Sequence, residues 1–323
     1  MKAIIRHSYG SPDDLELKDV DEPEVTGDEV LVRVVASGVN MADVDYLRGH
    51  PRIGRLGTGL GTPRNTRLGL DLAGYVEAVG PRVTRFEPGD EVFGDLTNHG
   101  YGAFAEYACA SEKAFAPKPT NLTFEEAAVM PQSGVMAVEG LRGKNPIEQG
   151  DEVLINGAGG GIGPFAVQIA KSFGAEVTGV DSARKLDLVR SVGADHVIDY
   201  SREVFAKSGH RYDWILDIAT TRSIFAMRRV LKPDGTYLSI PDSVGKAFQA
   251  FVMGPLISLA GSRTLGMSPW KPFNPQDVAT LTRFIESGEL KPVIDKRYPL
   301  TEVAEALQYQ ESGEARGKLV IIV

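Results

Sequence analysis

The stretch INGAGGGIGPFAVQIAKSFGA, residues 155–175, is typical of a turn between a buried strand and a helix. Its glycine run follows the apolar strand VLIN (153–156) and opens an amphipathic helix at Gly163, and EVTGVD (176–181) follows where a second strand is expected. Small residues let the backbone close on a phosphate, and the N–H groups at the helix start face its negative charge. The stretch predicts a dinucleotide-binding turn, with a glycine-rich packing turn as the alternative.

The phosphate-binding residues are predicted by aligning the turn on its last glycine. They are Gly157, Ala158, Gly160, Gly161, Ile162 and Gly163. Ala158 stands where the strictest fingerprint has glycine, and Gly163 is the position that lets the helix pack closely on the strand.

The end of the second strand bears on the choice between NADH and NADPH. An acid at Asp181 is typical of NADH binding, because it accepts hydrogen bonds from the ribose hydroxyls. Its neighbours Ser182, Arg184 and Lys185 instead suit a 2′-phosphate. A carboxylate about 4 Å from that phosphate costs about 4 kcal/mol at an effective dielectric near 20, unless Asp181 turns away. This stretch alone leaves both cofactors open.

The pattern of predicted secondary structure changes near residue 122. Before it, short β-type runs such as EVLVRVVASGV (29–39) are separated by Gly, Pro and Asp turns. After it, Thr123 and Glu126 have capping-box spacing, and strands then alternate with helices up to TYLSIP (236–241). This alternation predicts a doubly wound parallel α/β sheet over 123–262. Two later helices and the strand KLVIIV complete the chain.

Composition excludes several classes of function. A length of 323 residues favours two domains. The net charge of −8 argues against a nucleic-acid or anionic-membrane surface. A single cysteine, Cys109, excludes an internal disulfide and a multi-cysteine zinc site, and it suits a reducing compartment. The first residues lack the apolar core of a signal peptide, so we expect a cytoplasmic protein.

The most apolar stretch is AFQAFVMGPLISLAG, residues 247–261. It is shorter than a membrane span and is interrupted by Gly254 and Pro255. We expect a buried or interface helix pair here. A flap over a substrate pocket and a patch that touches a membrane are the alternatives.

The whole chain resembles the zinc-free quinone oxidoreductase-like branch of the medium-chain dehydrogenase/reductase superfamily. The resemblance is carried in order by SGVNMADVDYLRG (37–49), GLDLAGYVEAVG (69–80), RFEPGDEVFG (85–94), INGAGGGIG (155–163), GADHVIDY (193–200) and ARGKLVIIV (315–323). It implies a GroES-like β domain over 1–122 and 263–323, a Rossmann domain over 123–262, and an active site between the two. It also implies a homodimer.

The catalytic candidates lie in GVNMADVDYLRG. Asn40 occupies the position where this family places an Asn near the nicotinamide; its amide donates to the substrate carbonyl, or it only satisfies loop backbone. Tyr46 is the candidate proton relay, with packing under the substrate as the alternative. Asp45 orients Tyr46, binds a polar substrate or is a solvated loop acid. We expect a structural ion pair between Asp43 and Arg48.

The resemblance also informs the cofactor and metal. Lys185 and Tyr200 have the spacing with which NADPH-using relatives hold the 2′-phosphate, so NADPH is favoured over NADH. Ile240 is expected to contact the cofactor. Zinc-dependent relatives place Cys near Asn40 and His near Asp71, so no metal is expected here. Met136 and the turn 218–221 depart from the family pattern.

These observations predict an NAD(P)H-dependent reductase of an enone, enal or quinone. Without a metal to hold an alkoxide, alcohol oxidation lacks its usual Lewis acid, whereas reduction of an activated double bond needs only hydrogen-bond donors and a proton. Three alternatives stay open: an alcohol or ketone oxidoreductase, a biosynthetic tailoring reductase acting on one larger substrate, and a non-catalytic NADPH-binding protein.

Overall fold

The computed structural model describes residues 1–142, 146–241, 243–259 and 261–323 and divides into two compact units. The first unit comprises Met1–Ser133, Pro272–Thr282 and Pro292–Val323. The second unit comprises Gly134–Lys271 and Arg283–Lys291. The chain thus changes unit after Ser133, where the sequence suggested residue 122, and after Lys271, where it suggested residue 262.

The second unit is built on a parallel sheet. Within the described residues its strands are β8 (Glu152–Asn156), β9 (Glu176–Asp181), β10 (His196–Asp199), β11 (Tyr212–Asp217), β12 (Leu231–Ser239) and β13 (Thr264–Met267). Their order is β10-β9-β8-β11-β12-β13, and every neighbouring pair is parallel. This is the order of a doubly wound dinucleotide-binding sheet, so the predicted Rossmann domain is confirmed.

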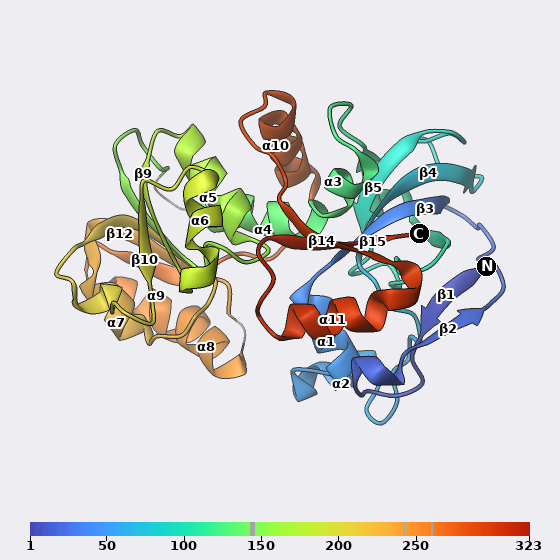
Figure 1. The fold of residues 1–323 in the computed structure, drawn as a ribbon, viewed down its shortest axis with the longest axis horizontal. Coiled ribbons are helices and arrows are strands. Elements are labelled where there is room, and N and C mark those ends of the chain that lie inside the picture. Colours follow the sequence, from blue (N-terminus) through green and yellow to red (C-terminus); the bar gives the residue numbers. More distant parts are fainter. Residues whose placement is uncertain (143–145, 242, 260) are drawn as a thin grey trace. The chain divides into compact units, whose positions relative to one another are not determined.

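Helices cover both faces of this sheet (Figure 1). The helices are α4 (Pro131–Gly140), α5 (Gly163–Ser172), α6 (Leu186–Ser191), α7 (Ile224–Arg229), α8 (Val244–Phe248), a π-helical turn at Gln249–Met253, and α9 (Gly254–Leu259). The strand order reverses direction at β8, and right-handed crossovers therefore place α5 and α6 on one face and α7 to α9 on the other. The reversal puts the ligand-binding crevice at the carboxyl end of β8.

The apolar stretch 247–261 is helical from Ala247 to Leu259. Its small residues face inward, since a Cβ at Gly254 would lie 2.6 Å from the carbonyl oxygen of Leu265. Its large residues face outward, with Phe251 69% and Leu259 85% exposed. Burial within the unit is therefore wrong for these large side chains, and their place in an interface stays a prediction. Strand β13, which Gly254 approaches, has no counterpart in the sequence reading.

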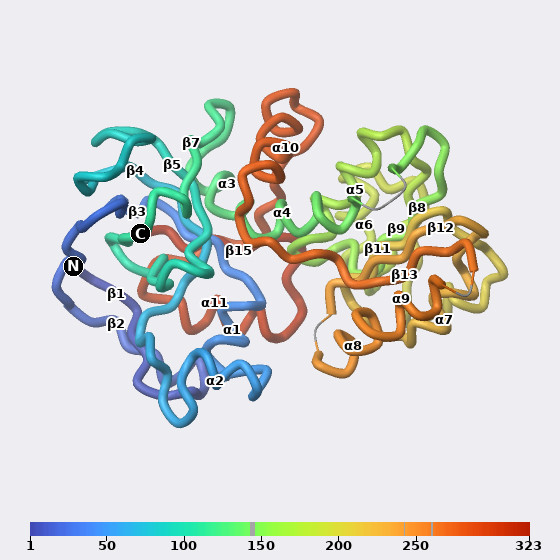
Figure 2. The backbone as a smooth tube through the Cα atoms, turned by 180° about the vertical axis from the view of Figure 1, so that it is seen from behind, coloured from blue at the N-terminus to red at the C-terminus, as the bar shows by residue number. Residues whose placement is uncertain are grey.

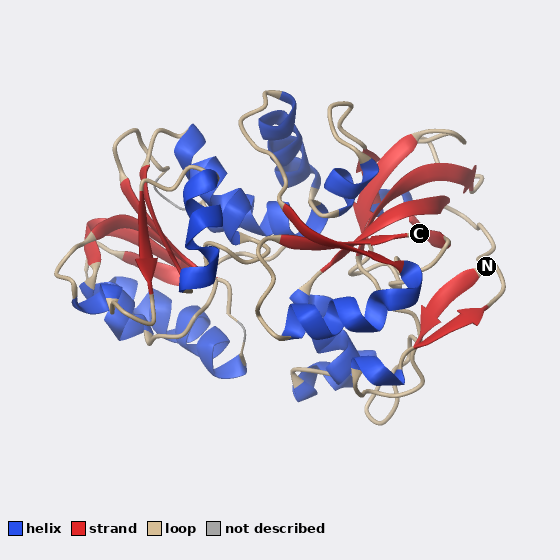
Figure 3. Ribbon diagram, in the orientation of Figure 1, coloured by secondary structure: helices blue, strands red, loops and turns tan. Residues whose placement is uncertain are grey.

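The first unit contains a mainly antiparallel β-domain, in which only β14 and β15 of the described strands pair in parallel; all strands are red in Figure 3. Within the described residues its main sheet contains β3 (Glu29–Val39), β4 (Asp71–Val79), β5 (Glu91–Asp95), β6 (Tyr107–Ser111), β7 (Phe115–Pro117), β14 (Ile294–Pro299) and β15 (Lys318–Ile322). The order is β14-β15-β3-β4-β5-β7, with β6 also paired to β3. The C-terminal strand β15 thus returns to β3, as the GroES-like prediction requires (Figure 2).

Local sequence explains most of these elements. Val30, Val32 and Val34 alternate along β3 and enter one apolar core. Thr123 and Glu126 form the predicted capping box of α3 (Phe124–Ala128). The remaining helices of the first unit are α1 (Met41–Arg48), α2 (Arg55–Thr58) and α11 (Val303–Glu311), and α10 (Pro275–Glu286) begins in this unit. A separate hairpin, β1 (Lys2–Ile5) with β2 (Glu16–Asp19), was not predicted.

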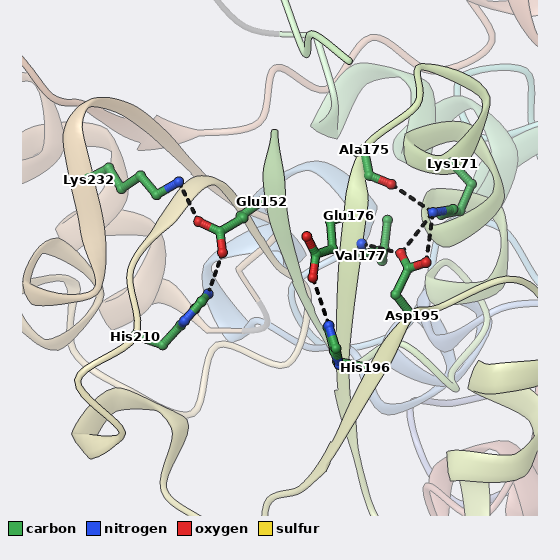
Figure 4. A network of polar contacts seen from close by, with 9 residues as sticks. All are labelled: Glu152, Lys171, Ala175, Glu176, Val177, Asp195, His196, His210 and Lys232. Carbon is green, nitrogen blue, oxygen red and sulfur yellow. Dashed lines mark hydrogen bonds and ion pairs between the residues drawn. The ribbon is translucent and has the colours of Figure 1, made fainter. Parts of the chain in front are cut away.

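Charged residues gather at the amino ends of the parallel strands in the second unit (Figure 4). Lys171 Nζ lies 2.8 Å from Asp195, and His196 Nε2 lies 2.8 Å from Glu176. Glu152 contacts both His210 and Lys232. We call these the amino-end charge pairs. They lie at the edge opposite to the one where doubly wound sheets bind ligands.

Candidate active site

The glycine turn of the second unit has the geometry predicted for it. Gly157 follows β8 with a φ of 91°, a left-handed conformation that favours glycine. A Cβ at Gly163 would clash with the backbone carbonyl of Ala158, so only glycine allows α5 to approach β8 this closely. Ala158 is fully buried beneath the turn.

The same turn has room for a phosphate. A Cβ at Gly160 would meet no heavy atom closer than 3.7 Å, which is the carbonyl oxygen of Gly157. Gly161 and Ile162 then lead into α5, whose first N–H groups have no partner within the helix. Because the ten-residue helix also directs its positive dipole end here, the turn fits the pyrophosphate of a dinucleotide.

Asp181, at the end of β9, is fixed by backbone amides. Its Oδ2 accepts a hydrogen bond of 2.8 Å from the N–H of Gly159, and its Oδ1 accepts one of 2.7 Å from the N–H of Ser182. A Cβ at Gly159 would also lie 2.6 Å from Cβ of Lys185. Gly159 is not among the residues predicted from the sequence, and its role appears only from this hydrogen bond.

The other predicted cofactor residues gather at the same end of the sheet. The N–H of Tyr200 donates to the carbonyl of Asp181 at 3.2 Å, and the N–H of Lys185 donates to Ser182 at 2.9 Å. The Tyr200 side chain is 54% exposed and Arg184 is exposed, whereas Lys185 is buried. Their contact with a 2′-phosphate stays a prediction.

Asp217 was missed by the sequence reading. Its buried carboxylate accepts from Asn156 Nδ2 at 2.7 Å, from the N–H of Thr220 at 2.9 Å and from the hydroxyl of Tyr237 at 3.1 Å. Burial raises its pKa, and these donors oppose that rise. The carbonyl of Asp217 also accepts from the N–H of Ile240, which places Ile240 at this edge. The sequence contains an indication of this site, because the apolar strands EVLIN and WILD each end in a polar residue.

In the first unit, Asn40 belongs to a buried polar group that we call the Lys318 cluster. Its members are Asn40, Asp43, Asp71, Asp95, Ser133 and Lys318, all at most 4% exposed. Asn40 Nδ2 donates to Asp71 Oδ2 at 3.0 Å, and Asn40 Oδ1 accepts from Lys318 Nζ. Lys318 Nζ also donates to Ser133 Oγ at 3.1 Å and to the carbonyl of Val39 at 2.9 Å.

These contacts bear on the role expected of Asn40. Its amide oxygen and its amide nitrogen are both engaged inside the first unit. The structure therefore supports its role as a loop anchor, and donation to a substrate carbonyl stays a prediction.

Burial disfavours charge throughout the Lys318 cluster. It raises the pKa of Asp43 to about 7 and raises the pKa of Asp71, an effect that the nearby Asp95 strengthens. It also raises the pKa of Asp95 and lowers the pKa of Lys318, although the three carboxylates oppose the latter change. One ammonium among three buried carboxyl groups favours a state in which some of these acids hold protons.

The expected ion pair between Asp43 and Arg48 is wrong. Asp43 is 1% exposed, and its Oδ2 accepts from the N–H of Asn40 at 2.8 Å, which closes the capping box of α1. Arg48 points elsewhere and donates to the carboxylate of Glu311 on α11 at 2.7 and 2.9 Å. The sequence showed two opposite charges in one loop, but the helix directs them to different neighbours.

Tyr46, on α1, is half-buried and packs against Tyr101. The ring centroids lie 4.5 Å apart, with the planes inclined by 59°. The carbonyl of Tyr46 accepts a hydrogen bond from the buried guanidinium of Arg6. Asp45 is half-buried, and its carbonyl accepts from the N–H of His50 at 2.8 Å; its catalytic role stays a prediction.

Two searches of the described residues gave no candidate. Across 1–142, 146–241, 243–259 and 261–323, no group of three or more His, Cys, Asp or Glu residues has the geometry of a metal site. In the same part of the chain, no helix is long and apolar enough to cross a membrane.

Two family models match the chain. The model described as "Alcohol dehydrogenase GroES-like domain" matches residues 26–120, and the model described as "Zinc-binding dehydrogenase" matches residues 192–321.

Curated relatives match almost the whole chain. A 2-methylene-furan-3-one reductase of Solanum lycopersicum is 35% identical over 332 residues, covering 99% of this chain and 79% of the relative. An NADPH-dependent alkenal/one oxidoreductase, described as chloroplastic, of Arabidopsis thaliana is 33% identical with the same coverage. Among solved structures, the quinone oxidoreductase from Coxiella burnetii is similar, with a TM-score of 0.85, 28% identity, and coverage of 100% of this chain and 99% of that one.

Proposed function

Because the chain belongs to the quinone oxidoreductase-like branch of the medium-chain dehydrogenase/reductase superfamily, we propose that it reduces small α,β-unsaturated ketones or aldehydes with NADPH. It is an NAD(P)H-dependent oxidoreductase of the kind that transfers hydride to an enone or a quinone. The observation that carries the enone proposal is the environment of Asn40. Lys318 Nζ bonds to Asn40 Oδ1 and Ser133 Oγ, so an ammonium already uses the oxygens that a metal would need.

This environment favours double-bond reduction over carbonyl reduction. Hydride addition to a carbonyl carbon forms an alkoxide, which needs a strong electrophile such as a metal ion on its oxygen. Hydride addition to the β-carbon of an enone forms an enolate, whose delocalised negative charge hydrogen-bond donors can stabilise. NADPH, when bound, supplies a hydride for the β-carbon. The chain then has to supply one proton to the α-carbon, and the phenol of Tyr46 is the group assigned to that step. Water restores the proton, so hydride and proton together reduce one double bond.

The preference for NADPH rests on charge at the end of β9. Lys185 and Arg184 supply two cations near Asp181, whose two oxygens already accept backbone N–H groups. Those N–H donors partly offset the negative charge of the Asp181 carboxylate, and the two cations offset the repulsion between that carboxylate and a 2′-phosphate. The relative from Arabidopsis thaliana is described as NADPH-dependent.

Product analysis with labelled cofactor tests the reaction. The purified chain is incubated with a chelator, an enone or a quinone, and NADPH carrying deuterium on its nicotinamide. We expect oxidation of the cofactor to proceed with chelator present, and the deuterium to appear on the β-carbon of the enone. Deuterium on the carbonyl carbon would establish a ketone reductase instead. Tight cofactor binding without turnover across a broad panel would establish a non-catalytic binding protein.

Replacement of Lys185 by Ala tests the cofactor preference. Loss of one cation from a 2′-phosphate site is expected to raise the KM for NADPH about tenfold, or about 1.4 kcal/mol, and to leave the KM for NADH nearly unchanged. Arg190→Ala, on the helix α6 that follows Lys185, is the matched control: this cation pairs with Asp187, and its loss should change neither KM. Equal effects of Lys185→Ala on both cofactors would contradict the NADPH preference.

The homodimer expected from the resemblance is also proposed here. Its support is the position of β13 at the edge of the described sheet, next to the exposed side chains Phe251 and Leu256. Sedimentation of the purified chain should give twice the chain mass, and Phe251→Asp should shift it toward the monomer. A monomer at all concentrations would overturn this proposal.

A further inference from the structure

Tyr101 lies in an unusual backbone conformation. Its φ is 59°, and it stands between Gly100 and Gly102, which also have positive φ values of 101° and 113°. Glycine adopts such angles freely, whereas a bulky L-residue does so rarely and at a cost that its surroundings must offset. The segment that joins β5 to β6 therefore holds Tyr101 in a strained conformation, and the flexible glycines on either side allow the backbone to adopt it.

The Tyr101 side chain packs against Tyr46, the proposed proton donor. The rings of Tyr101 and Tyr46 are 4.5 Å apart, with their planes inclined by 59°. Burial, followed by the neighbouring Tyr46 side chain, raises the pKa of Tyr101. Because burial disfavours the phenolate, Tyr101 keeps its proton and is a potential hydrogen-bond donor beside Tyr46.

A buried cation lies behind the pair. Arg6 is 2% exposed, its Nε donates to the carbonyl of Asn65 at 3.2 Å, and its Nη1 donates to the carbonyl of Tyr46. It interacts electrostatically with Tyr46 and Tyr101. Since a guanidinium keeps its charge in proteins, Arg6 favours negative charge on either phenol.

We propose that Tyr101 is a positioning residue for proton transfer by Tyr46. This inference rests on the proposed function, in which Tyr46 protonates the α-carbon. In this role the Tyr101 hydroxyl donates to the phenol oxygen of Tyr46, which leaves the Tyr46 proton free for the substrate. When that O–H bond breaks and the electron pair of the enolate forms the new C–H bond, the phenolate on Tyr46 keeps its donor. Water then returns a proton to Tyr46, and Tyr101 keeps its own.

The kinetic test uses Tyr101→Phe, which keeps the ring and removes only the hydroxyl. We expect kcat to fall about tenfold with the KM for NADPH unchanged, because the phenolate loses a hydrogen bond. The solvent deuterium isotope effect on kcat should rise, because proton transfer becomes more rate-limiting. Because Tyr101 acts through Tyr46, the double variant with Tyr46→Phe should be no slower than Tyr46→Phe alone.

Tyr75→Phe is the matched control. The Tyr75 ring lies 4.7 Å from the ring of Phe124 at an inclination of 54°, so the geometry is similar but the partner has no hydroxyl. This variant should leave kcat and the isotope effect unchanged. A Tyr101→Phe enzyme with the kcat and isotope effect of the unaltered chain would overturn the inference, and so would an equal loss on top of Tyr46→Phe.

A spectroscopic measurement needs no substrate. In the protein labelled with fluorotyrosine, the ¹⁹F resonance of Tyr46, identified by its loss in Tyr46→Phe, should move in Tyr101→Phe and stay in place in Tyr75→Phe. An unmoved resonance overturns the inference whatever the activity. Full activity of Tyr46→Phe overturns the proton-transfer role in the proposed function, even where the resonance moves.

Discussion

The Lys318 cluster and the amino-end charge pairs contain similar groups in opposite surroundings. Lys318 is 2% exposed and Asp71 is fully buried, whereas the side chains of His196 and Glu176 are 61% and 53% exposed (Figure 4). Water screens the second set and is excluded from the first. Ion pairs at a surface contribute about 0–1 kcal/mol, whereas removing one partner of a buried pair costs about 3–5 kcal/mol.

The two sets also differ in what they hold in place. Asn40 and Asp43 of the Lys318 cluster cap α1, the helix that carries Tyr46. The amino-end charge pairs join the strand ends opposite to the glycine turn. Burial and position together indicate that the first set contributes more to stability and fixes the start of α1, whereas the second set contributes little to either.

The largest effect is expected from Lys318→Met. This change removes the ammonium that Asn40, Ser133 and the buried carboxyl groups share, and it should lower the free energy of unfolding by about 3–5 kcal/mol. Urea unfolding followed by circular dichroism measures the change. Lys171→Met, at a pair that is 33–37% exposed, is the control and should cost less than about 1 kcal/mol.

A double variant sharpens this test. Adding Asp71→Asn to Lys318→Met also removes a buried carboxylate, so the pair should be less destabilised than the sum of the single variants. Equal losses from Lys318→Met and Lys171→Met would remove the distinction between the two sets.

A smaller effect, and one that depends on pH, is expected from Asp43→Asn. Burial raises the pKa of Asp43 from 3.8 to about 7, so the folded state binds a proton more tightly than the unfolded state. The stability that this proton contributes is fully present below pH 4 and is lost as the pH rises through 7, at about 1.4 kcal/mol per pH unit between those limits. Asn does not titrate, so the variant does not lose this contribution. The difference in the free energy of unfolding between the variant and the unaltered chain should therefore shift by about 4 kcal/mol in favour of the variant from pH 4 to pH 8.

For Asp195→Asn we expect the opposite pH dependence of the free energy of unfolding. Burial alone would raise the pKa of Asp195, but hydrogen bonds from Lys171 and Val177 lower it below 3.8. Its contribution to stability is therefore present above the unfolded pKa and is lost as the pH falls through the lower folded value. Unfolding curves between pH 3 and pH 8, taken at about one-unit steps, separate the two carboxylates. A difference between Asp43→Asn and the unaltered chain that stays constant with pH would contradict the raised pKa.

The sequence predicted what depends on neighbours along the chain. The glycine turn, the Thr123 capping box and the strand alternation of β3 each involve a few consecutive residues, and all three are confirmed. Lys318 reads as an ordinary lysine at the start of a strand, because its partners come from β4, β5 and α1. Tyr101 was missed for the same reason, since its meeting with Tyr46 depends on how a loop folds back. Opposite charges close in sequence misled the pairing of Asp43 with Arg48.

The smallest effect is expected at the amino-end charge pairs. His196→Gln removes a partner of Glu176 that is 61% exposed, so the free energy of unfolding should change by less than about 0.5 kcal/mol. Because the pair lies opposite to the glycine turn, the dissociation constant for NADPH, measured by isothermal titration, should stay the same. A several-fold loss of NADPH affinity would show that this edge influences the nucleotide, and it would break the separation between the two sets of charges.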